Sequence, residues 1–154
     1  MLEINNTTRQ KINLKKTAAI VAEFLRVYHK INWTVSLAIV GDAAIKKINR
    51  HYRGVDRATD VLSFNGGSSP TAVGKKRLAD KYLGEIIINI QEANRVKKYA
   101  ELWQEIGYVE KPKAEQIFYF LVVHGLLHLI GDNDETEPGR QEMLRQGKFF
   151  LEML

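Results

Sequence analysis

The longest apolar segment of the chain, residues 117–130, constrains the fold more than any other part of the sequence. As a helix it is apolar on every side, and a helix of that kind belongs in the centre of a domain. His124 and His128 interrupt it at a four-residue spacing, which places both imidazoles on one helix face. Burying two unpartnered imidazoles costs roughly 1–3 kcal/mol each. A metal ion or dedicated hydrogen bonds must therefore offset that cost.

The residues that follow the histidines indicate a metal site. Gly131 is a natural helix stop that turns the chain back toward His128, so that Asp134 can supply a third ligand. The spacing matches the zincin pattern H-E-x-x-H-x-x-G-x-x-H at both histidines, the glycine and the last position, where aspartate replaces the third histidine. Asp132, four residues after His128, is the competing third ligand. The alternative without metal is a structural pair of partly buried histidines.

The metal pattern lacks one catalytic group. Gly125 stands where a metalloprotease keeps its general-base glutamate, so the pattern indicates a zinc hydrolase scaffold without the usual peptidase acid/base group. The chain contains no cysteine, and a transition metal would therefore be held by imidazole and carboxylate. That ligand chemistry favours a catalytic site over a structural one.

Local sequence patterns predict the secondary structure. Runs of β-branched and aromatic residues predict strands at residues 2–6, 33–40, 60–64 and 83–90. Apolar periodicity and end signals predict helices at 14–29, 42–52, 91–104, 117–130 and from 136 onward, with Asp42 and Thr136 as caps. The order predicts an α+β domain, in which helices cover a mixed sheet of about four strands and the histidine helix packs centrally.

Composition sets the class of protein and of partner. The 154 residues, of which 45% are hydrophobic, suit one domain over residues 1–154. We expect a cytoplasmic protein with no membrane segment, because the N-terminus has no basic and then apolar signal and residues 117–130 are too short to span a bilayer. A net charge of +5 makes polyanions candidate partners.

Basic residues gather near two of the predicted loops. The first group surrounds the end of the 42–52 helix, where arginines beside an aromatic residue and a glycine suit phosphate binding. The second falls in residues 65–82, for which the sequence predicts a flexible loop at the rim of the site. Five of these residues are expected to contact substrate: Arg50, Arg57, Lys75, Lys76 and Arg77.

Three blocks of the sequence resemble one known family. Residues 124–131 read His-Gly-Leu-Leu-His-Leu-Ile-Gly, residues 49–64 contain Arg-Gly and then T-D-V-L-S-F, and residues 83–88 read Leu-Gly-Glu followed by three isoleucines. The blocks are similar, in the same order, to those of the YbeY-type endoribonucleases, also called rRNA maturation factors. The resemblance covers essentially the whole chain.

The resemblance implies a zinc-dependent endoribonuclease that prefers single strands and acts in 16S rRNA maturation and ribosome quality control. Its partners would be the small ribosomal subunit and assembly factors, with one zinc ion per chain. Apart from the resemblance, we expect a monomer. By position in the motifs, His124, His128 and Asp134 would hold the zinc. Arg53 would be the catalytic or phosphate-binding arginine.

The chain departs from the family pattern at four places. Asp134 replaces the third histidine, Asp132 and Asn133 replace a Tyr/His-Asp pair, Glu85 replaces a strand aspartate and Ala58 replaces a proline. A carboxylate ligand keeps zinc binding feasible but weakens the ion as a Lewis acid, so we expect lower activity or a shift toward higher pH.

Several alternatives remain open from the sequence. The proton acceptor is zinc-bound hydroxide, Glu85 or solvent, and nickel or iron can occupy such a ligand set in place of zinc. Two other functions compete with the nuclease: a non-catalytic RNA-binding ribosome-assembly factor, and a metalloprotease-like or other zinc hydrolase.

Overall fold

The computed structural model describes residues 1–66 and 81–153 of the chain. Those residues form the following elements in order: β1 (Leu2–Asn6), α1 (Leu14–Val27), β2 (Thr34–Val40), α2 (Asp42–Arg53), β3 (Val61–Asn65), β4 (Tyr82–Asn89), α4 (Ile90–Ala93), the 3-10 helix η1 (Val96–Tyr99), α5 (Ala100–Glu105), α6 (Ala114–Ile130) and α7 (Glu137–Glu152). Each predicted strand appears within one residue of its expected bounds.

The described strands form one mixed sheet in the order β1-β2-β4-β3. β1 pairs parallel to β2, and β2 pairs parallel to β4. β3 is antiparallel to β4, with Ser63 opposite Ile86. Among the described strands, β3 is therefore an edge strand. This architecture confirms the predicted α+β class and the mixed sheet of four strands.

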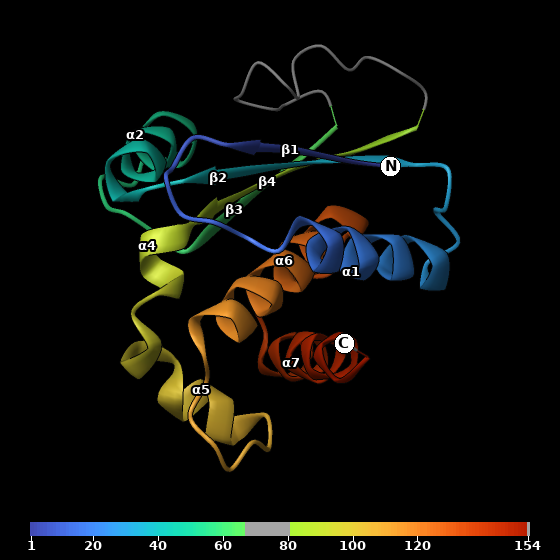
Figure 1. The fold of residues 1–154 in the computed structure, drawn as a ribbon, viewed down its shortest axis with the longest axis vertical. Coiled ribbons are helices and arrows are strands. Elements are labelled where there is room, and N and C mark those ends of the chain that lie inside the picture. Colours follow the sequence, from blue (N-terminus) through green and yellow to red (C-terminus); the bar gives the residue numbers. More distant parts are fainter. Residues whose placement is uncertain (67–80, 154) are drawn as a thin grey trace.

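α6 lies at the centre of the molecule, as its apolar composition predicts. It packs against β3 and β4 on one side, against α1 beside it and against α7 on its other side. In Figure 1, α1 and α6 lie below the sheet and α7 lies below α6. Eleven of the 17 residues of α6 are buried, which explains why the helix is apolar on every side. No helix in the described parts of the chain is long and apolar enough to cross a bilayer.

α2 covers the opposite face of the sheet. Its buried residue Ile45 packs in a small second core with Ala38, Val40, Leu62, Phe64 and Ile87. Gly54, at φ 70°, ends the helix as predicted, because glycine adopts this left-handed conformation without strain. The end of α2 is thereby held above β3, and Arg53 is its last residue.

The close contact of α6 with the sheet requires a glycine at position 125. A Cβ atom there would lie 2.6 Å from Cγ2 of Ile86, a distance that real side chains do not tolerate. The Ser63 hydroxyl also donates a hydrogen bond to the Gly125 carbonyl over 3.2 Å. Gly125 therefore faces the sheet, which explains physically why no glutamate stands at this position.

The predicted helix over residues 91–104 is wrong as a single element. α4 ends at Ala93, and the backbone of Arg95 leaves the helical region at φ −82° and ψ 57° before η1 and α5 follow. The Arg95 guanidinium turns back to Asp42 and Glu92, and the buried Tyr99 donates its hydroxyl to Asp60. These tertiary bonds outweigh the helical periodicity of the segment.

Two smaller predictions are also corrected. Gly41, not Asp42, is the N-cap of α2, because the Asp42 carboxylate accepts hydrogen bonds from Asn89 and Arg95. The first helix ends at Val27, because the Lys30 N–H bonds back to the Leu25 carbonyl in a closing turn. Thr136, by contrast, caps α7 as predicted, with its hydroxyl oxygen accepting from the Gly139 N–H.

Candidate metal centre

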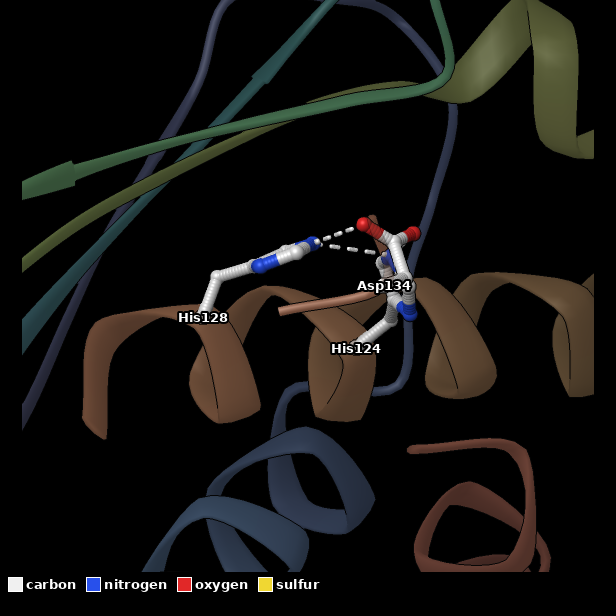
Figure 2. A group of neighbouring side chains, drawn as sticks. All are labelled: His124, His128 and Asp134. Atoms are coloured by element: carbon white, nitrogen blue, oxygen red, sulfur yellow. Dashed lines mark hydrogen bonds and ion pairs between the residues drawn. The ribbon is translucent and has the colours of Figure 1, made fainter. Parts of the chain in front are cut away.

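Three side chains converge above the C-terminal half of α6, and we call them the metal triad: His124, His128 and Asp134. Nε2 of His124 and Nε2 of His128 lie 3.1 Å apart. Oδ2 of Asp134 lies 3.5 Å from Nε2 of His124, and Oδ1 lies 3.8 Å from Nε2 of His128. Figure 2 shows the two imidazoles rising from one side of α6 and the carboxylate meeting them from the loop that follows. Each residue offers one ligand atom, and these three atoms lie within 4.8 Å of one another.

The loop that returns Asp134 is held at both ends. Gly131, at φ 106°, ends α6 in the left-handed conformation, and the Asp132 N–H returns to the Leu127 carbonyl over 3.1 Å. At the other end, Thr136 caps α7. Only four residues, 132–135, connect Gly131 to Thr136, so Asp134 stays over the histidines by local geometry.

Asp132 contributes its backbone and not its carboxylate. Nδ1 of His128 lies 3.0 Å from the Asp132 carbonyl oxygen, and a ring N–H that donates there leaves Nε2 as the free lone pair. Backbone carbonyls commonly orient metal-binding histidines in this way. Of the two aspartates that compete from the sequence, the structure brings the carboxylate of Asp134 to the histidines.

The triad has the dimensions of a zinc site. Tetrahedral zinc with bonds of about 2.0–2.2 Å requires ligand atoms about 3.3–3.6 Å apart. The two histidine nitrogens are 3.1 Å apart, and each lies 3.5 or 3.8 Å from one of the two Asp134 oxygens. With one ligand atom taken from each residue, the three atoms lie within 4.8 Å of one another, so small side-chain shifts bring them to zinc distances. Two imidazoles and one carboxylate also leave a fourth position for a reactant, as in catalytic zinc sites. The residues present therefore fit a divalent transition metal, and zinc among them.

His124 is prepared to bind metal in its neutral form. Its ring stacks on Phe120 with centroids 6.1 Å apart, and 19% of its side chain is exposed. Burial, together with the neighbouring His128, lowers the pKa of His124 below its ordinary value, although the carboxylates of Asp134 and Asp60 oppose this. A neutral imidazole keeps the lone pair that a metal requires. Nδ1 of His124 is buried and has no hydrogen-bond partner among the residues that the structure describes.

The triad opens into a pocket of about 900 Å³. Four segments line it, namely the end of α2, residues 60–65 around β3, the two histidines of α6 and residues 133–135. Arg53 enters from α2, where its guanidinium donates to the Ser63 carbonyl over 3.0 Å and lies over the Phe64 ring at 5.5 Å. The fold thus brings Arg53 to the same pocket as histidines more than 70 positions later in the chain.

The other residues predicted to contact substrate are placed differently. Arg50 and Arg57 do not line the pocket, although both are exposed, and Arg50 lies 3.8 Å from the Asp56 carboxylate. Lys75, Lys76 and Arg77 lie outside the described residues. A role for these five residues in binding substrate stays a prediction.

The suggestion that Glu85 accepts the proton is not supported by the geometry. Glu85 is fully buried in β4 and alternates with Ile86, whose side chain packs on α6. Because successive side chains of a strand point to opposite faces, Glu85 points to the α2 face of the sheet. It does not line the pocket of the triad.

Two pocket residues were missed from the sequence. Asp60 lines the pocket, where Oδ1 accepts the Val61 N–H over 2.8 Å and Oδ2 accepts the Tyr99 hydroxyl over 3.2 Å. Tyr52 lines it beside Arg53. Asp60 could have been found from the sequence, because it is the carboxylate of the T-D-V-L-S-F block. Tyr52 could not, because the 3.6-residue period assigned it to the inner face of its helix.

Comparison with known proteins identifies related sequences. The family model described as endoribonuclease YbeY matches residues 3–154. The endoribonuclease YbeY of Moorella thermoacetica is 42% identical over 113 residues, which are 71% of this chain and 65% of that protein. That of Desulfitobacterium hafniense is 39% identical over 116 residues, 73% of this chain and 66% of that protein. The matched region thus spans slightly less than two thirds of each relative.

A solved structure has the same fold. The solution structure of a Thermotoga maritima protein superposes with a TM-score of 0.60, covering 99% of this chain and 87% of the other. The two sequences are 24% identical, so this likeness concerns the fold alone.

Proposed function

Because this chain belongs to the YbeY endoribonuclease family, we propose that it is a metal-dependent endoribonuclease whose active site is the pocket around the metal triad. One observation carries the proposal: Arg53 of α2 and the triad beside α6 line the same pocket. A cationic phosphate ligand and a metal site in one cavity suit the cleavage of a phosphodiester bond.

The finer parts of the proposal follow from the family and the ligand set. The metal is zinc, held by His124, His128 and Asp134, and the substrate is single-stranded RNA, with 16S rRNA maturation and ribosome quality control as the setting. The small ribosomal subunit and its assembly factors in the cytoplasm are the corresponding partners. When bound, zinc supplies Lewis-acid chemistry that polarises a phosphoryl oxygen.

Arg53 binds the scissile phosphate. Its guanidinium carries five N–H donors, of which one goes to the Ser63 carbonyl. Its contacts with Ser63 and Phe64 restrain it, so little entropy is lost when it meets a phosphate. A bidentate guanidinium stabilises the negative charge that develops on the phosphoryl oxygens in the transition state.

Asp60 takes the proton of the attacking water. Gly125 cannot be replaced by the protease glutamate without a clash, and Glu85 points to the other face of the sheet. Asp60 lines the pocket, and its carboxylate is oriented by the Val61 N–H and the Tyr99 hydroxyl. The Thr59 hydroxyl also donates to Oδ1 over 3.2 Å. A carboxylate has about four acceptor positions, so these three bonds leave one position for a water molecule.

The test is cleavage of a labelled single-stranded RNA by the chain after chelation and after reconstitution with zinc. We expect cleavage with zinc, little cleavage after chelation, and none of a peptide substrate. If the protein takes up one zinc per chain and binds RNA without cleaving it, the non-catalytic assembly factor is the correct function. Cleavage of peptide in place of RNA would identify a protease.

A further inference from the structure

Tyr52 is an exposed aromatic residue at the rim of the pocket. It is 41% exposed and lines the cavity directly beside Arg53 in the last turn of α2. The rest of the lining is rich in groups that suit phosphate or metal, such as the guanidinium, the imidazoles and the carboxylates. Tyr52 and Phe64 add benzene rings to this lining, and of these two Tyr52 is the exposed one, since Phe64 is only 7% exposed.

The Tyr52 ring is held in place by edge contacts. It packs against Phe64 with centroids 5.4 Å apart and an interplanar angle of 71°, and against His51 at 4.6 Å and 77°. Both contacts are T-shaped, and neither is a parallel stack. Phe64 also lies beneath the Arg53 guanidinium. One buried ring thus positions both an aromatic platform and a phosphate ligand.

This pair has the chemistry of a nucleotide site. A guanidinium binds the phosphate, and an aromatic face next to it stacks with the adjoining base. Packing on Phe64 uses only part of Tyr52, because the residue stays 41% exposed and also lines the pocket.

We propose that Tyr52 is a stacking platform for an unpaired nucleobase next to the phosphate bound by Arg53. This inference rests on the proposed RNA substrate and names a residue that makes the site prefer single strands. A base within a duplex is stacked on both faces and paired, so it cannot lie on the Tyr52 ring without being extruded.

Binding of a labelled single-stranded oligoribonucleotide tests the proposal by fluorescence anisotropy. The full chain is used in the presence of a chelator, so that the RNA stays intact whether or not the protein is a nuclease. Tyr52→Phe keeps the ring and should bind like wild type. Tyr52→Leu should bind about 5- to 150-fold more weakly, the loss expected for one stacked base. Phe149→Leu, an exposed aromatic residue of α7 outside the pocket, is the matched control.

A scan with single abasic sites separates stacking from a change in folding. Removing the stacked base should weaken binding to the wild-type protein and leave binding to Tyr52→Leu unchanged. Equal affinities of wild type and Tyr52→Leu for the intact RNA would overturn the stacking role. So would an equal loss of affinity in both proteins when the base is removed. Neither result would contradict the proposed function. If the wild-type protein binds no single-stranded RNA, the proposed function itself fails.

Discussion

Nδ1 of His128 lies 3.0 Å from the backbone carbonyl oxygen of Asp132, and this contact distinguishes the two aspartates after α6. The carbonyl orients the imidazole, and Nε2 then faces His124 and Asp134. Asp132 acts through its backbone carbonyl oxygen, which any other residue would also provide at this position. Asp134 acts through its side-chain carboxylate. The two positions should therefore respond differently to substitution.

Asp134→Ala should lower zinc affinity by at least about 10- to 100-fold, since even partners that only orient the ligands have effects of that size. Asp132→Ala is the matched control and should bind zinc nearly as well as wild type, because the backbone carbonyl remains. Titration with zinc against a competing chelator at neutral pH measures both. Equal losses in the two variants would contradict the assignment of Asp134, and no uptake by wild type would make the histidines a structural pair.

Arg53→Ala should reduce kcat for single-stranded RNA by about 10²–10³-fold, the effect of removing one group that stabilises developing charge. Arg53→Lys should recover part of the loss, because lysine keeps the charge but not the bidentate geometry. Arg26→Ala is the control, since Arg26 lies on α1 and pairs with Glu23. Wild-type cleavage rates in Arg53→Ala would show that Arg53 has no catalytic role.

Asp60→Asn should reduce kcat by about 10²–10⁴-fold, the usual contribution of a general base. The amide oxygen still accepts the Val61 N–H, so the variant is expected to fold. Glu135→Gln changes the other carboxylate beside the triad, which is exposed and makes no hydrogen bond within the described residues, and its kcat should change little. If Glu135→Gln lost activity and Asp60→Asn did not, Glu135 would be the proton acceptor.

Gly125→Ala should destabilise the fold by about 1–3 kcal/mol, because the new methyl group meets Cγ2 of Ile86 at 2.6 Å. The sign of this change in stability tests the contact, because Gly→Ala inside a helix without such a contact stabilises the fold by about 0.5–1 kcal/mol. Urea unfolding measures the change. Combining it with Ile86→Ala removes the clash, so the double variant should be more stable than the sum of the single effects predicts. A stabilised Gly125→Ala would disprove the close contact.

Asp42 should make the fold more stable at neutral than at acidic pH. Hydrogen bonds from Arg95, and then from Asn89, lower the pKa of Asp42 in the folded state. A carboxyl group whose pKa is lowered by folding stabilises the folded state at pH values above its unfolded pKa of about 3.9. That stabilisation is lost as the pH falls through the pKa of the folded state.

Asp42→Asn tests this by urea unfolding at about pH 6 and about pH 3. The variant should be less stable than wild type at the higher pH, by no more than about 1 kcal/mol because the pair is partly exposed. The difference in unfolding free energy between wild type and Asp42→Asn should be smaller at the lower pH. An equal difference at both pH values would mean that the charge of Asp42 does not contribute to stability.

Much of this molecule follows from local sequence. The β-branched runs predict the four strands, Gly54 and Gly131 mark helix ends where a positive φ is needed, and the spacing of His124 and His128 places both imidazoles on one face of a helix. These features depend on residues within a few positions of one another, so their physical causes can be seen in the sequence itself.

Tertiary structure alone decided the remaining features, because each depends on contacts between distant segments. β3 pairs antiparallel to β4 above α6, which brings Arg53 and Asp60 to the triad and turns Glu85 toward the opposite face. The helix predicted over residues 91–104 breaks because Arg95 and Tyr99 bond to Asp42 and Asp60. Local periodicity contains no information on such distant partners, so only the folded chain shows them.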